Sequence, residues 1–223
     1  MATKVDYLES VDLFQDLTSA EVESLVHKTA LKCYEAGHLF YMPEDPGEAL
    51  FILKRGRVQL YRMSPDGRKF VLGIMHEGAI FGHMALVGQH SHNTFAEALD
   101  DCVICVWSRD EVEQLLLKKP RVALRFLEVM SERLFRTEER LEEMTFKRVP
   151  ARVANLLIQL NDDQGSTGML RGYTHQYLAD MLGTYRETVT QTLNEFKQEQ
   201  LIRIGRKSIE ILDMSGLRLV ANS

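Results

Sequence analysis

Long hydrophobic runs, cysteine and positive net charge are all scarce in this sequence. No run of about eighteen apolar residues occurs, so we expect no membrane-spanning helix. The opening stretch, MATKVDYLES, lacks the apolar core of a signal peptide, and we therefore expect a cytoplasmic protein. Three cysteines are an odd, low number, which suits reduced thiols rather than a disulfide framework.

The remaining composition is that of an ordinary globular protein. The chain has 223 residues, 45% hydrophobic and 26% charged, which is enough for one large domain or two small ones. The formal net charge of −5 excludes a protein that coats nucleic acid by bulk charge. It leaves room for a local surface that reads DNA.

Residues 30–107 consist of short apolar runs separated by turn residues. Five glycines recur here every nine to eleven residues: Gly37, Gly47, Gly56, Gly67 and Gly78. This spacing predicts a β-roll of the jelly-roll type. Capping-box pairs, Thr18 with Glu21 and Ser108 with Glu111, predict flanking helices. We assign residues 1–119 to this sensor domain.

One long helix is predicted over residues 121–147, with Pro120 in its first turn. Spacings of three and four residues alternate along a narrow seam: Leu127, Met130, Leu134, Thr137, Leu141 and Met144. Such a seam predicts pairing with a second copy of the same helix, hence a homodimer; packing on the chain's own roll is the alternative. The sequence RVP at 148–150 ends the helix. We assign residues 120–149 to a dimerisation helix and a hinge at Phe146, Arg148 and Pro150.

Residues 150–223 are predicted to form a smaller helical domain. Thr174 caps a short helix that ends at Gly183, and Thr184, with Glu187 as its capping-box partner, starts a second helix. Two helices joined by a short glycine-containing turn form a helix-turn-helix. The stretch LIRIGRKSIEIL then predicts two strands around Gly205, which would make a wing.

The second helix of such a unit enters the DNA major groove with its N-terminal residues. Those residues are Tyr185, Arg186, Glu187, Thr190 and Gln191. An arginine can pair with guanine, a glutamate can accept from cytosine, and a glutamine can pair with adenine. Phosphate contacts are expected from the start of the preceding helix, at Thr174, His175 and Gln176. The alternatives are a solvated arginine at 186 and a purely capping role for Glu187.

Together these features resemble the cAMP receptor protein / fumarate-nitrate reductase regulator (CRP/FNR) family. The resemblance runs from about Leu8 to Leu219 and is most specific in YTHQYLADMLGTYRETVTQTLNEFKQEQLI. It implies an α+β fold with a cyclic-nucleotide-binding-like β-roll, a dimerisation helix and a winged helix-turn-helix. It also implies a bacterial activator or repressor that binds palindromic double-stranded DNA and RNA polymerase. Arg186 and Glu187 match the family's base-reading residues, whereas Gln191 replaces a further base-contacting arginine.

The effector cassette departs from the cyclic-nucleotide branch of that family. Gly82 matches, but His83 replaces the ribose-binding glutamate, and the arginine and serine positions fall on His92 and Asn93, or on Asn93 and Thr94 after a one-residue slip. On the long helix, Thr137 matches an adenine contact and Glu138 replaces a serine. A buried cyclic phosphate needs a charged fork that histidine does not supply near pH 7. We therefore expect that cAMP is not the effector.

Three histidines lie within ten residues, at His83, His90 and His92. His90, His92 and Glu97 resemble a cupin metal motif, which leaves open a metal site or, less favoured, a jelly-roll metal enzyme. Some family members sense gases through haem, for which His76, His83 and Met84 are axial-ligand types. The third reading is a polar loop at the pocket rim.

An iron–sulfur cluster is not expected, because that branch of the family uses four cysteines. Cys102 and Cys105 belong to an apolar run that predicts a strand, on which they point to opposite faces. We expect one core thiol and one partly exposed thiol.

The sequence thus predicts a sequence-specific, homodimeric DNA-binding regulator and no enzyme. Effector binding in the roll would shift the hinge between conformations that bind DNA differently. Arg148 stands where the cAMP receptor protein has a capping aspartate, so the effector-free protein is a candidate for constitutive DNA binding.

Overall fold

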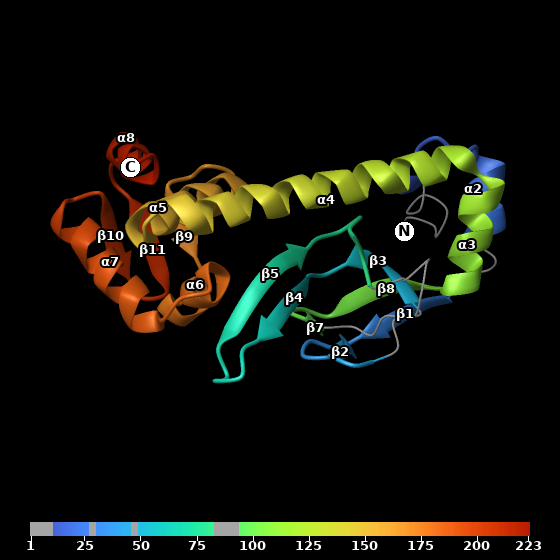
Figure 1. The fold of residues 1–223 in the computed structure, drawn as a ribbon, viewed down its shortest axis with the longest axis horizontal. Helices are drawn as coiled ribbons and strands as arrows, with labels where there is room; N and C mark the ends of the chain where they lie inside the picture. Colours follow the sequence, from blue (N-terminus) through green and yellow to red (C-terminus); the bar gives the residue numbers. More distant parts are fainter. Residues whose placement is uncertain (1–10, 27–29, 46–48, 83–93) are drawn as a thin grey trace. The chain divides into compact units, whose positions relative to one another are not determined.

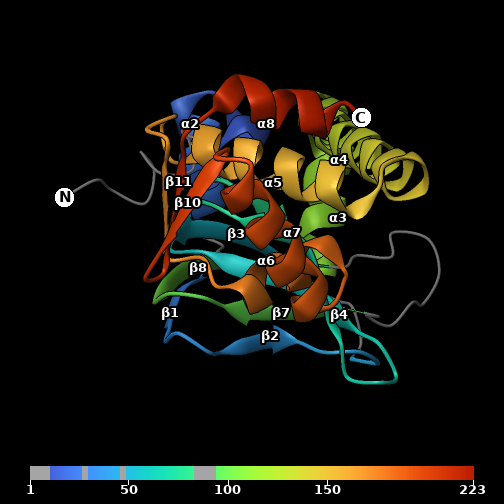
Figure 2. The ribbon, with the colours of Figure 1, turned by 90° about the vertical axis from the view of Figure 1, so that its left-hand side faces the viewer.

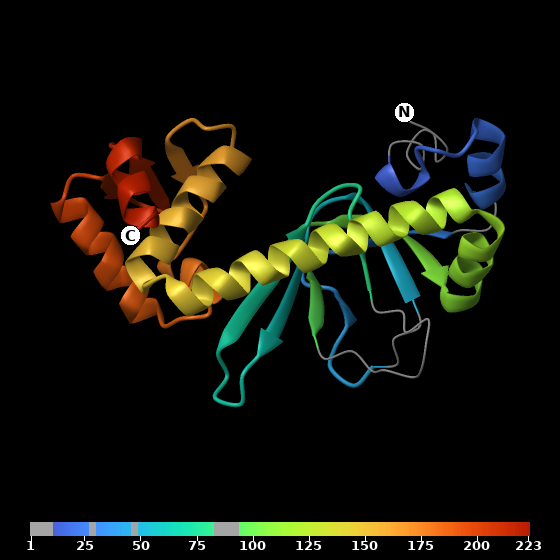
Figure 3. The ribbon, with the colours of Figure 1, turned by 45° about the horizontal axis from the view of Figure 1, so that its top comes forward.

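The computed structural model describes residues 11–26, 30–45, 49–82 and 94–223 (Figure 1). The chain divides into two compact units. The first contains residues up to 62 together with 72–134, and the second contains residues 63–71 together with 135–223. The division falls inside the long helix α4 (Pro120–Phe146), which is continuous along its whole length (Figure 3).

Antiparallel strands make up most of the first unit. One sheet has the order β1-β8-β3-β6, and the other has the order β2-β7-β4-β5. The strands of the first sheet are β1 (Ala30–Tyr34), β8 (Cys102–Ser108), β3 (Ala49–Arg55) and β6 (Ile80–Phe81). Those of the second are β2 (Leu39–Tyr41), β7 (Phe95–Ala98), β4 (Val58–Met63) and β5 (Lys69–Met75). Two facing antiparallel sheets confirm the predicted roll.

Short helices flank the roll as the capping boxes predicted. They are η1 (Asp12–Phe14), α2 (Ser19–Val26) and α3 (Arg109–Lys118). Ser108 and Glu111 satisfy each other's backbone N–H groups at the start of α3. The Glu21 carboxylate accepts from the Thr18 backbone and from Lys119, which lower the pKa of Glu21 to about 2.

Strand β8 is buried on both of its faces, and this corrects one prediction. Cys102 and Cys105 do point to opposite sides, but each enters a separate apolar cluster. Both side chains are fully buried, whereas the sequence predicted that one would be partly exposed. The prediction assumed that one side of this strand faces solvent. Strand β8 is a central strand with an apolar cluster on each side, so neither side is exposed.

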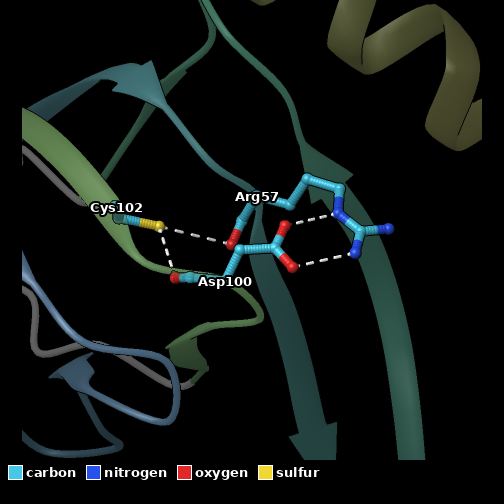
Figure 4. A network of polar contacts seen from close by, with 3 residues as sticks. All are labelled: Arg57, Asp100 and Cys102. Atoms are coloured by element: carbon cyan, nitrogen blue, oxygen red, sulfur yellow. Dashed lines mark hydrogen bonds and ion pairs between the residues drawn. The ribbon is translucent and has the colours of Figure 1, made fainter.

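A polar network anchors the start of β4 to the turn before β8 (Figure 4). The Arg57 guanidinium donates to both carboxylate oxygens of Asp100, at 2.6 and 3.0 Å, and lowers the pKa of that carboxyl. The Cys102 thiol lies beside the backbone oxygens of Asp100 and Arg57, at 3.2 and 3.5 Å. Burial raises the pKa of the Cys102 thiol, which disfavours the reactive thiolate form.

The second unit contains a winged helix-turn-helix (Figure 2). Its helices are α5 (Val149–Asp163), α6 (His175–Leu182), α7 (Arg186–Gln198) and α8 (Met214–Ala221). Strands β9 (Met169–Arg171), β10 (Ile202–Gly205) and β11 (Ser208–Ile211) form a small sheet in the order β10-β11-β9. One apolar cluster joins all four helices and the three strands, with Leu157, Leu178, Leu193 and Leu217 at its centre.

The two wing strands around Gly205 are confirmed, and two elements go beyond the prediction. Strand β9 lies in a stretch for which we had predicted no strand, and α8 follows the wing with Asp213 as its N-cap. The Asp213 side chain accepts from the Gly216 N–H at 3.0 Å. Both elements complete the apolar core of the domain, which the wing and three helices alone would leave open.

Thiol labelling tests the burial of the cysteines. Cys33 is exposed, while Cys102 and Cys105 are buried. A disulfide reagent should therefore modify one thiol rapidly in the native protein and all three after unfolding. A Cys33→Ser variant should then show no rapid phase. Rapid native reaction of a second thiol would contradict the burial of β8.

Candidate nucleic-acid interface

The bounds of helix α6, and its packing against α7, are set by individual residues of the sequence. Thr174 caps α6 by accepting from the Tyr177 N–H at 3.1 Å, as predicted. Gly183 ends α6 in the left-handed conformation, with φ 64° and ψ 36°, which glycine adopts at little cost. Ala179 is completely buried beneath the turn, where a larger side chain would separate the helices.

The predicted cap at Thr184 is wrong by one residue. Helix α7 begins at Arg186, and Tyr185 is its N-cap residue. Thr184 instead donates its N–H to the Ala179 carbonyl at 3.0 Å, which completes the end of α6. The connection between α6 and α7 is therefore one residue longer than predicted. Glu187 lies in the first turn of α7 and does not form a capping box with Thr184. An acidic side chain there still interacts favourably with the helix dipole.

Helix α7 is sharply two-sided. Val189, Leu193 and Phe196 are buried in the domain core. The opposite face forms a shallow depression lined only by polar and charged side chains: Arg186, Glu187, Thr190, Gln191, Asn194, Glu195 and Gln198. Arg186, Glu187 and Gln191 are exposed on this face. The base-reading candidates thus share one accessible surface.

The three predicted phosphate contacts all have intramolecular partners. The Thr174 hydroxyl caps α6, and Gln176 donates to Asp180 at 2.8 Å. His175 Nδ1 lies 2.9 Å from the Thr190 hydroxyl, so this side chain bridges α6 and α7. Gln191 donates to Glu195 at 3.0 Å along α7. These groups would have to share or exchange partners to contact DNA.

The seam of α4 is largely exposed in the single chain. Leu127, Leu134 and Leu141 keep 60–64% of their surface accessible. Met144 is also exposed, Met130 is half-buried, and Thr137 is exposed. The exposed surface of the helix further includes three large apolar residues that the seam prediction did not contain: Leu124, Phe135 and Phe146. Leu124 lies three residues before Leu127 and extends the seam, whereas Phe135 and Phe146 do not stand at seam spacing and lie off it.

The hinge residues lie at the junction of α4 and α5. Phe146 ends α4 and is strongly exposed, and Pro150 lies in the first turn of α5. Arg148 is the N-cap residue of α5. A guanidinium has only donors, so it cannot accept from the helix N–H groups as an aspartate would. Around this junction Glu143 accepts from Lys147 at 3.2 Å and from Asn155 at 2.5 Å.

Much of the predicted effector cassette lies outside the described residues, namely His83, Met84, His90, His92 and Asn93. Gly82 is described, with φ 112°, and a Cβ there would lie 2.5 Å from the Ala49 carbonyl oxygen. The Tyr41 hydroxyl shares hydrogen bonds with Thr94 and the Gly82 backbone. On α4, Thr137 and Glu138 are both exposed.

Of the metal and haem candidates, the structure describes Glu97 and His76. Glu97 is hydrogen-bonded to Tyr61, and burial together with this carboxylate raises the pKa of Tyr61 to about 12. His76 is exposed. Within the described ranges, no three His, Cys, Asp or Glu side chains come close enough together to hold a metal ion.

Three arginines that the sequence analysis did not predict donate side-chain hydrogen bonds to backbone carbonyls. Arg133 of α4 donates to the Ile80 carbonyl at 3.0 Å, and burial lowers its pKa. Arg140 of α4 and Arg152 of α5 donate to the carbonyls of Met181 and Leu182 at the end of α6. The seven-residue spacing of Arg133 and Arg140, which puts them on one face of α4, was the available signal.

Comparisons with known proteins agree with this architecture. A cyclic nucleotide-binding domain model matches residues 31–119, and a Crp-like helix-turn-helix model matches residues 151–220. A CRP-like cAMP-activated global transcriptional regulator of Mycobacterium tuberculosis is 27% identical, covering 95% of this chain and 97% of that protein. A global nitrogen regulator of Synechococcus elongatus is 25% identical, covering 90% and 91% respectively. A solved crp/fnr-family regulator from Eubacterium rectale has a TM-score of 0.77 at 22% identity, covering 95% and 98%.

The fold and the two matched domain models define a DNA-binding transcription regulator with a cyclic-nucleotide-binding-like sensor domain. The chain belongs to the CRP/FNR family, whose members dimerise and bind DNA under the control of an effector. In the part of the chain that the structure describes, no helix is both long and apolar enough to cross a bilayer.

Acid should destabilise the second unit through His175. Burial, and then the charge of Arg186, lower the pKa of His175, so the unfolded chain binds this proton more readily. The resulting stabilisation is fully present above the ordinary pKa of about 6.5 and is lost as the pH falls below it. Between about pH 7.5 and 5.5, the unfolding free energy of the wild type should fall further than that of His175→Gln. Equal losses in urea titrations would contradict this role.

Proposed function

We propose that this protein is a homodimeric, sequence-specific regulator that reads palindromic DNA through the exposed face of α7. The observation that supports this most directly is the two-sided helix: its apolar side is fixed in the domain core, and its polar side is open. Because a base-reading side chain must be held in register with a groove, a rigid anchor behind it favours specific over loose binding.

The chemistry of that face sets the proposed contacts. Arg186 would donate two parallel hydrogen bonds to guanine, and Glu187 would accept from the cytosine amino group. Thr190, Gln191 and Tyr185 would contact neighbouring bases or backbone. At the start of α6, Thr174, His175 and Gln176 would contact phosphates through the donors that their internal partners leave available. No step of bond making is required of any of these residues, and we propose no enzymatic activity.

Pairing of two chains along α4 would place two α7 helices on one duplex. The exposed leucines of the seam are large apolar groups at coiled-coil spacing, and a second copy would remove them from water. Half-sites read by such a dimer lie about one helical turn apart. We further propose a cytoplasmic protein that acts with RNA polymerase at promoters.

Regulation is proposed to act at the junction of α4 and α5. An effector in the roll would shift the population of DNA-binding conformations through Phe146, Arg148 and Pro150. The relatives' names cover different signals, cAMP in one and nitrogen in another. The residues at the cassette positions of this chain, with His83 for glutamate and no arginine, support an effector other than cAMP or constitutive DNA binding. Haem or a metal at the histidine cluster is the alternative sensor.

Replacing Arg186 by alanine should remove discrimination at one base pair of each half-site. The expected loss is about 1–3 kcal/mol against the cognate base, because a bidentate contact to guanine disappears. Fluorescence anisotropy with duplexes varied at single positions measures this. Arg218→Ala removes an exposed charge from α8 and is the matched control. A uniform loss over all sequences would assign Arg186 to phosphate contact instead.

Calorimetric titration with cAMP tests the proposed effector class. Without a guanidinium in the cassette, the cyclic phosphate has no fixed bidentate partner, and we expect no binding at micromolar cAMP. Footprinting of the ligand-free protein on its own DNA site then separates the two alternatives. Protection without any ligand is expected if the protein binds DNA constitutively. Micromolar cAMP affinity would refute the assignment.

A further inference from the structure

The tip of the hairpin between β4 and β5 belongs to the same compact unit as the helix-turn-helix. Residues 63–71 group with residues 135–223. Two side chains of this tip make specific contacts there: the Phe70 ring lies under Gly183, and the Arg68 guanidinium lies over the Tyr185 ring. Gly183 is the turn of the helix-turn-helix, and Tyr185 is the N-cap of α7. The contacts therefore fall on the two residues that set where α7 begins.

Phe70 is enclosed on two sides. A Cβ at Gly183 would lie 2.9 Å from the Phe70 ring, closer than real Cβ contacts allow, so the ring and the turn are in direct contact. On its other side, the Arg140 guanidinium lies 4.7 Å from the centre of the Phe70 ring. Arg140 also donates to the Met181 carbonyl, two residues before Gly183. Phe70 thus fills the space between α4 and the turn.

Arg68 is held in place before it reaches Tyr185. Its Nε donates to Asp66 at 2.7 Å, and Asp66 in turn accepts from the Ser64 hydroxyl at 2.5 Å. The guanidinium carbon lies 4.9 Å from the centre of the Tyr185 ring, within the range of a cation–π contact. Tyr185 nevertheless keeps 54% of its surface accessible. The hairpin touches the N-cap residue without covering it.

We infer that Phe70 and Arg68 are positioning residues for α7, and that the hairpin tip fixes the angle at which the recognition helix meets DNA. The polar face of α7 stays exposed beside the hairpin contact, so the hairpin leaves the proposed base-reading side chains accessible. This role rests on the proposed function, since positioning matters only if α7 reads bases. The contact has two parts. The Phe70 ring supports the turn at Gly183, and the Arg68 cation supports the N-cap residue Tyr185.

Two readouts test the inference on the full chain. The first is affinity for a duplex that the wild type selects from a random pool, compared with a scrambled duplex of the same composition. Arg68→Ala should weaken selected-site binding about two- to fivefold, the equivalent of one exposed cation–π contact, and Phe70→Ala about tenfold. Scrambled-duplex binding should change no more than in Arg62→Ala, which removes an equal exposed charge from β4. Arg68→Lys keeps the cation and should recover most of the loss.

The second readout is amide hydrogen exchange in the DNA-free protein. Both alanine variants should speed exchange at residues 184–190 while leaving α8 unchanged. Unchanged exchange there, or tighter binding to the selected duplex, would overturn the positioning role. If the wild type selects no sequence at all, the proposed DNA function fails, and the exchange experiment still decides whether the hairpin holds the start of α7.

Discussion

Two arginine side chains hold the carboxyl end of α6, and the arrangement of the DNA-binding unit depends on them. Arg140 and Arg152 donate to the adjacent carbonyls of Met181 and Leu182, which otherwise point out of the last turn of the helix. The negative end of the helix dipole favours both cations there. Burial lowers the pKa of each guanidinium, so these contacts also offset the cost of taking two charges out of water.

The two donors come from opposite sides of the proposed hinge. Arg140 precedes the break between α4 and α5, and Arg152 follows it, yet both end on the same turn of α6. A rotation of α4 about residues 147 and 148 must therefore break one of these hydrogen bonds or carry α6 with it. Because α6 passes through Gly183 into α7, the second outcome moves α7 and the face proposed to read DNA. This gives the proposed switch a physical path made of named contacts.

The sequence predicted the elements whose signals are local and missed those that depend on neighbours. The glycine spacing, the capping residues and the left-handed Gly183 each reflect a backbone requirement, and they predicted the roll, α6 and α7, while the alternating apolar seam predicted α4. The N-cap of α7 was misplaced because the Thr184 amide is used by α6, which only the folded turn shows. The burial of the Cys102 and Cys105 pair was misjudged because alternation gives the face of a residue and not what covers that face. The roles of Arg140 and Phe70 depend on contacts across long stretches of chain, which periodicity does not encode.

Charge explains why a dimer matters for the proposed function. Helix α7 carries two basic and two acidic residues, and the whole chain has a net charge of −5, so nonspecific attraction to phosphates is weak. Discrimination must then come from base edges, at a few kcal/mol for each half-site. With little charge to hold it on the phosphates, a single winged helix of this composition is expected to bind DNA weakly. Two of them linked along α4 make the second contact intramolecular, which raises affinity without added charge. In the proposed dimer, the exposed apolar seam of α4 and the nearly neutral helix α7 would thus act together.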